Sequence, residues 1–63
     1  MLNAQLTSIN EKIGDEWFDT VTVTTNGETV ATIKVAPSED PDTYDQALAD
    51  AGFPDVEWLD SNL

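Results

Sequence analysis

Residues 17–35, WFDTVTVTTNGETVATIKV, decide the fold. Two runs within this stretch, 17–25 and 29–35, are rich in aromatic and β-branched residues, which favour β-strands. Asn26-Gly27 lies between the two runs, and this dipeptide is a strong signal for a tight hairpin turn. The sequence therefore predicts a β-hairpin at the centre of the chain.

Two registers of this hairpin compete. A two-residue Asn26-Gly27 loop would set Asp19 opposite Lys34 but divide the apolar residues between the two faces of the sheet. A three-residue loop over 25–27, with Gly27 in a bulge, gathers one apolar face instead. That face comprises Trp17, Val21, Val23, Ala31, Ile33 and Val35. Burying it contributes several kcal/mol, whereas an exposed ion pair contributes at most about 1 kcal/mol. We therefore expect the bulged register.

The opposite face of the predicted hairpin carries threonines together with two apolar residues. Its members are Thr20, Thr22, Thr24, Thr32, Phe18 and Val30. Threonine is frequent on half-exposed strands, so we expect this face to be solvated. Phe18 and Val30 could still form a small apolar contact patch there.

Helices are expected on both sides of the hairpin. Leu2, Leu6, Ile9 and Ile13 recur at helical spacing and precede Gly14, which predicts an amphipathic helix over 2–13. After the hairpin, Asp40 suits an N-cap and Pro41 a first helical position. We expect this second helix over 41–51, with Tyr44, Ala47, Leu48 and Ala51 inward, closed by Gly52, Phe53 and Pro54.

The C-terminal segment 55–59 alternates between polar and apolar residues and predicts a short third strand, with Val56 and Trp58 inward. A right-handed crossover would place this strand beside the hairpin. The expected fold is α+β in the order α-β-β-α-β, with a small three-stranded sheet in one domain spanning 1–63.

Length and composition limit what this domain can be. Sixty-three residues give a thin core, so a homodimer is plausible. Cysteine and histidine are both absent, which excludes disulfides, the usual zinc sites and nucleophile–histidine catalysis. The N-terminus lacks the basic and apolar regions of a signal peptide. No apolar run reaches membrane-spanning length. We expect a complete, soluble, cytoplasmic chain.

The charge of the chain is strongly negative and uneven. Thirteen carboxylates face only Lys12 and Lys34, for a net charge of −11. Residues 1–36 carry five acids and both lysines, whereas residues 37–63 carry eight acids and no base. Direct binding to nucleic acid or to an anionic membrane is therefore disfavoured, and a partner protein with a basic surface is favoured.

The second predicted helix concentrates these acids. At 100° per residue, Asp42, Asp45 and Asp50 fall on one outward arc, and flanking segments supply more carboxylates. The predicted partner-binding residues are Glu39, Asp42, Asp45, Asp50, Asp55, Glu57 and Asp60. Their spacing is comparable to that of phosphates along a nucleic-acid strand. A solvated face that keeps the protein soluble is an equally weighted alternative.

Metal binding and catalysis are not expected. Asp40, Asp42 and Asp45 begin like a calcium loop, but the sixth position is not glycine and the twelfth is Ala51. Paired carboxylates for glycoside hydrolysis would need a cleft for which so small a domain has little room. The sequence predicts no enzyme, no cofactor and no metal site.

In size and charge, the chain resembles phage-encoded inhibitors of host defence, such as anti-restriction and anti-CRISPR proteins. That resemblance implies an acidic mimic of nucleic acid that blocks the basic channel of a DNA- or RNA-handling protein in the host cytoplasm. Two alternatives stay open. One is a small virion or assembly adaptor that binds through its aromatic residues. The other is a salt-adapted domain whose acidity carries no information about a partner.

Overall fold

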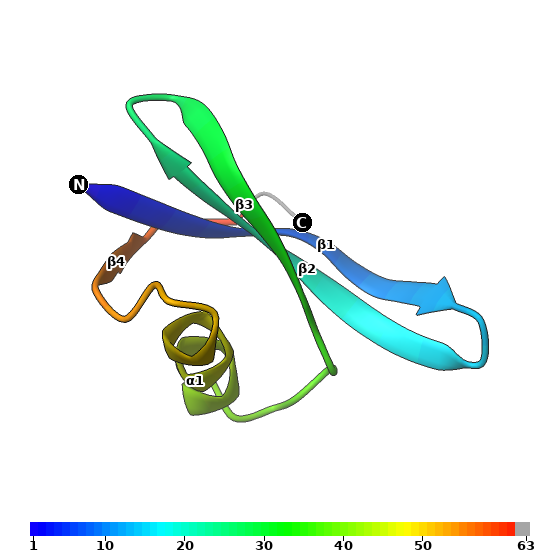
Figure 1. Ribbon diagram of the computed structural model, residues 1–63. Coiled ribbons are helices and arrows are strands. Elements are labelled where there is room, and N and C mark those ends of the chain that lie inside the picture. Colours follow the sequence, from blue (N-terminus) through cyan, green and yellow to red (C-terminus); the bar gives the residue numbers. More distant parts are fainter. Residues whose placement is uncertain (62–63) are drawn as a thin grey trace.

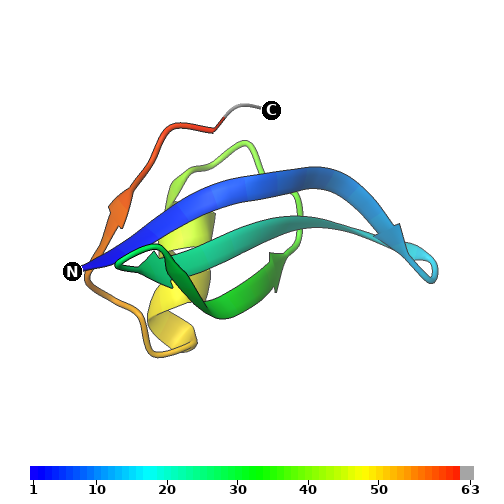
Figure 2. The same ribbon diagram turned by 90° about the horizontal axis from the view of Figure 1, so that it is seen from above.

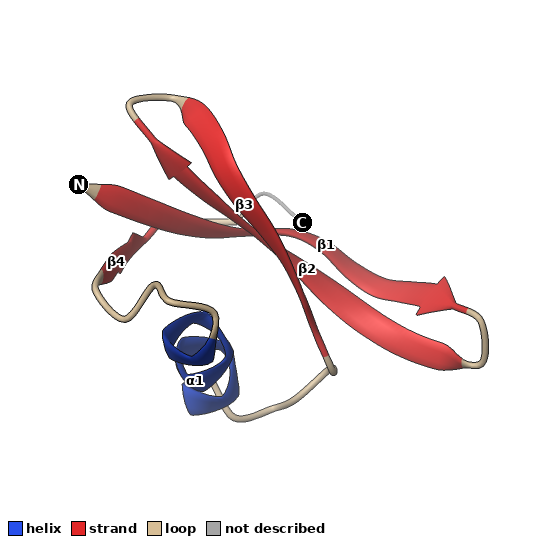
Figure 3. Cartoon of the chain, viewed as in Figure 1, coloured by secondary structure: helices blue, strands red, loops and turns tan. Residues whose placement is uncertain are grey.

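A four-stranded mixed sheet with one helix on one face forms the domain, in a computed structural model that describes residues 1–61 (Figures 1 and 3). The elements are β1 (Leu2–Ile13), β2 (Glu16–Thr25), β3 (Glu28–Val35), α1 (Asp42–Asp50) and β4 (Val56–Trp58). The strand order is β3-β2-β1-β4, and β4 pairs parallel with β1. The predicted α+β class is confirmed, but the sheet has four strands rather than three.

The predicted N-terminal helix is wrong, because residues 2–13 form the long strand β1. β1 pairs antiparallel with β2 and is interrupted by two register shifts, between Leu6 and Ser8 and between Ser8 and Glu11. Each shift inserts one extra residue on β1, and Asn10 adopts a left-handed φ of 53° at the second one. These insertions break the strict alternation of a strand. The resulting apolar spacing imitates a helix in the sequence.

Gly14 has the positive φ expected for a helix C-cap, but it serves a turn. Ile13 pairs with Glu16, so Gly14 and Asp15 form a two-residue hairpin loop. Gly14 has a φ of 63° and occupies the first central position, as in a type II′ turn. Glycine is favoured for the same conformational reason at both kinds of site.

The β2–β3 hairpin has the predicted faces but a different loop. Val21 pairs with Ile33 and Val23 with Ala31, so the apolar residues share one face as predicted, although a three-residue loop over 25–27 would pair Val21 with Ala31. The loop itself is the two-residue Asn26-Gly27 turn, with both residues at positive φ. The shift occurs further along, between Val23 and Thr24, where β3 carries the extra residue Val30. The need to bury apolar side chains therefore determines which residues face the core. The extra residue is accommodated as a bulge within β3 and not in the loop.

The hydrophobic core lies between the sheet and α1 (Figure 2). Its buried apolar residues are Ala4, Val21, Val23, Val35 and Leu48, and Ala31 and Ile33 pack against them half-buried. Trp17 was predicted to join this core but is 53% exposed. Nine helical residues cover about 13 Å, whereas the ten residues of β2 extend over about 33 Å. The helix is too short to cover the end of the sheet that carries Trp17.

The other face of the sheet, away from α1, is only partly solvated. Most of its threonines are half-exposed or exposed, as expected, but Thr20 is buried under hydrogen-bonded neighbours. Val30 lies at the β3 bulge and is 48% exposed, and Phe18 is half-buried. The prediction of a solvated face is therefore wrong for Thr20.

α1 forms close to the predicted place and ends as predicted. It spans Asp42–Asp50, and the N-cap residue is Pro41 and not the predicted Asp40. The Asp40 carboxylate accepts the Asp42 backbone N–H at 3.0 Å. At the other end Gly52 has a φ of 98°, and the Phe53 N–H donates to the Leu48 carbonyl at 2.8 Å. Together with the bond from the Gly52 N–H to the Ala49 carbonyl at 3.1 Å, this bond forms a Schellman motif. Leu48 is buried as predicted, whereas Ala51 is exposed.

β4 is shorter than the predicted strand 55–59 and lies beside β1, not beside the β2–β3 hairpin. Val56 is half-buried against the core. Trp58 was predicted to point inward, but it is 39% exposed at the edge of the helix. None of the helices in the described residues is long and apolar enough to cross a membrane.

Candidate functional site

The helix α1 presents its acidic residues to solvent. Asp42, Asp45 and Asp50 are all exposed, and Leu48 on the opposite side is fully buried. Burial of Leu48 fixes the rotation of the helix about its axis. The predicted outward direction of the three aspartates is therefore confirmed.

The loop before α1 is held by its own side chains. The Ser38 hydroxyl bonds to the Thr43 hydroxyl at 3.0 Å and accepts the Asp40 backbone N–H at 3.1 Å. Glu39 is exposed within this loop. The bonds of Ser38 and Asp40 fix the start of the helix, so the acidic residues around it occupy defined positions.

The structure divides the predicted carboxylate row into two groups. Asp42 and Asp50 line a shallow hollow of about 480 Å³ between α1 and the end of β3, together with Asp40. Asp50 also accepts a hydrogen bond from the Gln46 side chain at 3.0 Å. Asp40, assigned only a capping role from the sequence, thus belongs to the acidic surface.

Asp45 lies on the other side of the helix, toward β4. It lines a smaller hollow of about 150 Å³ with Pro41, Tyr44 and Trp58. The indole Nε1–H of Trp58 donates to the Asp45 carboxylate at 2.6 Å. The Trp58 ring and the Asp45 carboxylate therefore lie side by side at the surface, which the sequence did not indicate.

The remaining predicted residues lie on the C-terminal segment and are exposed. Glu57 pairs with Asn3 on β1, and strand alternation places it on the opposite face of the sheet from Trp58 and α1. Asp60 lies along the edge of β1, where its backbone carbonyl accepts the Gln5 side-chain N–H at 2.7 Å. Asp55 lies just before β4. Gln5 alternates with the buried Ala4, so its side chain lies on the sheet face away from α1. Glu57 and Asp60 are thus separated from the helix face, whereas Asp55 lies in the segment that joins α1 to β4.

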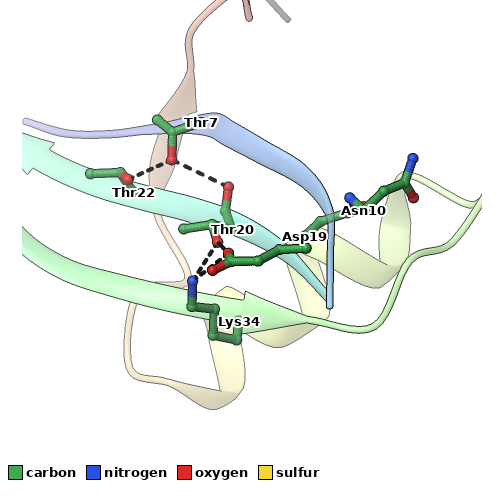
Figure 4. A network of polar contacts seen from close by, with 7 residues as sticks. Thr7, Asn10, Asp19, Thr20, Thr22 and Lys34 are labelled. Carbon is green, nitrogen blue, oxygen red and sulfur yellow. Dashed lines mark hydrogen bonds and ion pairs between the residues drawn. The ribbon is translucent and has the colours of Figure 1, made fainter. Parts of the chain in front are cut away.

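Both cations of the chain lie away from the helix face. Lys34 is on the opposite face of the sheet, where its Nζ donates to Glu11 at 2.8 Å and to Thr20 at 2.7 Å (Figure 4). The hydrogen bonds from Lys34 and Thr20, with the positive charge of Lys34, lower the pKa of Glu11. Lys12 lies over the Trp17 ring at 5.9 Å. The acidic residues near α1 therefore have no lysine to neutralise them.

A buried carboxylate that the sequence did not single out joins the helix to the sheet. Asp19 is 4% exposed and accepts two hydrogen bonds. One comes from the Asn10 backbone N–H at 2.9 Å, and the other from the Tyr44 hydroxyl at 2.5 Å. The bond to Asp19, followed by burial, raises the pKa of the Tyr44 hydroxyl. The sequence did carry a signal of this contact. Asp19 alternates with apolar residues on one face of β2, and a carboxylate buried there needs a hydrogen-bond donor.

The chemistry available at the helix face is ion binding through carboxylates. The sequence has no cysteine and no histidine. Within residues 1–61, no three acidic side chains gather closely enough to hold a metal ion. Both hollows beside α1 are shallow and open to solvent. The arrangement suits an extended contact with a positively charged surface more than the enclosure of a small ligand.

Comparison with known proteins gives no relative: no protein-family model matches the chain, no curated protein matches it, and no solved structure matches it.

Proposed function

We propose that the protein is a binding protein, not an enzyme, and that it blocks a basic, nucleic-acid-binding surface of a partner protein. The observation that carries the proposal is the exposed acidic surface around α1, which has no lysine beside it. We call this surface the acidic helix face and define it by six carboxylates of α1 and the segments on either side of it. They are Glu39, Asp40, Asp42, Asp45, Asp50 and Asp55.

The spacing of the carboxylates supports a mimic of nucleic acid. Asp42 and Asp50 lie about 12 Å apart along the helix axis at 1.5 Å per residue. A nucleic-acid strand places one phosphate about every 3.4 Å along its axis, so this interval corresponds to about three or four phosphates. A protein channel lined by arginine and lysine would meet Asp42 and Asp50 on one side of the helix and Asp45 on the other.

The rigid mounting of the acids also supports the proposal. Asp40 and its loop are hydrogen-bonded, Asp45 is held by Trp58, and Asp50 by Gln46. Carboxylates that are already positioned lose less side-chain entropy when a partner binds. The net charge of −11 would in addition accelerate the approach of a basic partner. The site of action on this proposal is the cytoplasm, that of the host cell if a phage encodes the chain.

The decisive experiment removes three charges while keeping the shape of the helix. In the triple variant D42N/D45N/D50N, the amide oxygens can still accept the bonds from Trp58 and Gln46. The matched control D15N/E16Q/E28Q removes the same charge from exposed positions in or next to the two hairpin turns. Each tagged protein is used to capture partners from a cell lysate, with elution by a rising salt gradient.

We expect the unmodified chain and the control to capture the same partner, released by moderate salt and displaced by added duplex DNA or by RNA. The helix variant should lose that partner, because each lost contact removes part of the electrostatic attraction. Equal capture by both variants would contradict the proposal, and so would a partner that nucleic acid does not displace.

The adaptor alternative has one specific observation in its favour, the exposed aromatic ring of Trp17. An adaptor of this kind would bind through Trp17 or Phe18 and would tolerate the loss of the helix charges. Its complex would resist salt, because apolar contacts are not screened. The same elution experiment therefore separates the two functions.

A further inference from the structure

The smaller hollow beside α1 combines aromatic rings with a single carboxylate. Its walls are Pro41, Tyr44, Asp45 and Trp58, and its volume is about 150 Å³. Pockets that enclose drug-sized ligands measure roughly 300–1,000 Å³, so this hollow has room for one side chain and not for a larger molecule. The hollow on the other side of α1 has no aromatic residue among the described residues that line it.

Hydrogen bonds hold both rings of the hollow in place. The Trp58 indole Nε1–H donates to the Asp45 carboxylate at 2.6 Å, and the Tyr44 hydroxyl donates to the buried Asp19 at 2.5 Å. Trp58 lies on β4, whose pairing with Ala4 of β1 fixes the backbone. The polar group of each ring is thus already bonded, so the rings offer the hollow their apolar and π surfaces. The site is ordered before any ligand arrives.

The carboxylate of Asp45 retains capacity for a further donor. Trp58 donates to Oδ1, and Oδ2 accepts no hydrogen bond from the described residues. Lys12 and Lys34 lie elsewhere, over Trp17 and beside Glu11, so neither neutralises this charge. A free carboxylate oxygen beside an indole ring is the combination that attracts a cation able to stack on an aromatic surface.

We propose that this hollow is the subsite for one arginine side chain of the partner protein. A guanidinium group stacks through its flat face while its in-plane N–H groups donate to a carboxylate, whereas a lysine ammonium cannot stack in this way. In nucleic-acid complexes, arginine bonds to phosphate and also stacks on bases. Asp45 would then replace a phosphate and Trp58 a base. Assigning the arginine to a partner rests on the proposed function.

The test is an NMR titration of the full ¹⁵N-labelled chain with N-acetyl-arginine-N-methylamide. The corresponding lysine and citrulline compounds are the controls, because citrulline keeps the shape of arginine without its charge. Sodium chloride is adjusted so that the ionic strength stays constant. The indole N–H of Trp58 reports on the hollow, and that of Trp17, the other tryptophan, is an internal control.

We expect the arginine compound to shift the Trp58 signal with a dissociation constant of about 10–100 mM, because one exposed ion pair and one stacked cation bind weakly. The lysine compound should bind severalfold more weakly, and the citrulline compound should give no saturable shift. Equal binding of arginine and lysine would overturn the assignment, as would equal shifts of the Trp17 and Trp58 signals.

Two pairs of variants separate the subsite from the general negative charge. Asp45→Asn should weaken arginine binding about threefold or more, although its amide oxygen can still accept the Trp58 N–H. Asp42→Asn removes the same charge from the other hollow and should have little effect. Trp58→Leu should also weaken binding about threefold, whereas Trp17→Leu should not. The backbone amide of residue 45 is the reporter in all four variants, and circular dichroism verifies their folding.

The subsite is refuted if Asp45→Asn and Asp42→Asn weaken binding equally, because long-range charge alone would then explain the attraction. The outcome is distinguishable from failure of the proposed function. A chain that captures a partner displaced by nucleic acid but does not bind the arginine compound would refute the subsite and leave the function standing. Specific arginine binding without such a partner would refute the mimic and leave the subsite.

Discussion

Val21 and Trp17 lie on the same face of β2, yet Val21 is fully buried and Trp17 is 53% exposed. The difference is that α1 covers one and not the other. Beneath the helix, Leu48 packs on the sheet and the Tyr44 hydroxyl donates to the buried Asp19 carboxylate. Beyond the helix lies the end of the β1–β2 hairpin over residues 9–18, which we call the arm. The arm has neither a second layer nor a third strand. The comparison shows that buried core and exposed apolar surface lie at opposite ends of a single hairpin.

The largest effect in this comparison is expected for Leu48→Ala. Leu48 is fully buried in the core, so its truncation should lower the free energy of unfolding by about 2–5 kcal/mol. Ile13→Ala, a truncation of similar size in the arm, should cost less than about 1 kcal/mol, because the side chain is 46% exposed. Urea unfolding of the two variants gives both values. Equal losses would show that the arm is part of the folded core.

An intermediate effect is expected for Tyr44→Phe, which leaves Asp19 with one hydrogen bond fewer in a buried position. The loss of stability should be about 1–3 kcal/mol near neutral pH. The raised pKa of Tyr44 favours its neutral form in the folded chain, so this contribution is fully present below pH 10. It is lost as the pH rises through the raised pKa.

The measurement is the stability difference between the unmodified chain and Tyr44→Phe at a series of pH values. The difference should stay constant up to about pH 10 and shrink above it. Other groups that titrate in this range are shared by both proteins and cancel in the difference. A gap that persists unchanged to the highest pH at which both proteins fold would refute the role of the Tyr44 hydroxyl.

The smallest effect concerns Glu11 and Lys34, which meet on the solvent-exposed face of the sheet. The side-chain carboxyl of Glu11 should titrate below its ordinary pKa of 4.5 in an NMR experiment. In Lys34→Met the midpoint should move back toward that value. A lowered pKa contributes stability above the ordinary pKa that is lost as the pH falls through the lowered one. An unchanged midpoint in Lys34→Met would assign the shift to Thr20 alone.

Elements that depend on local signals could be predicted from the sequence. The faces of the β2–β3 hairpin and the position of α1 follow from alternation, from Asn26-Gly27 and from the Gly52-Phe53 ending. The outward direction of Asp42, Asp45 and Asp50 follows from the same helix geometry. Their division between two hollows could not be predicted, because it depends on where β3 and β4 lie relative to the helix.

The error at the N-terminus has a physical cause. Leu2, Leu6, Ile9 and Ile13 match the spacing of a helix, but only the first two of them pack against the core. Ile9 and Ile13 belong to the exposed arm, and two register shifts separate them from the regular part of β1. Periodicity counts every apolar residue as buried, so exposed apolar residues and bulges together imitated a helix.

The sequence by itself determined the hairpin, the capped helix and the concentration of acids after residue 36, because each depends on neighbours in the chain. Only the tertiary structure decided that residues 2–13 form a strand, since the free edge of β2 needed a pairing partner. It also decided that Trp17 is exposed and Asp19 buried. The physical reason is that burial depends on which distant segment covers a residue, and the nine-residue helix covers only one end of the sheet.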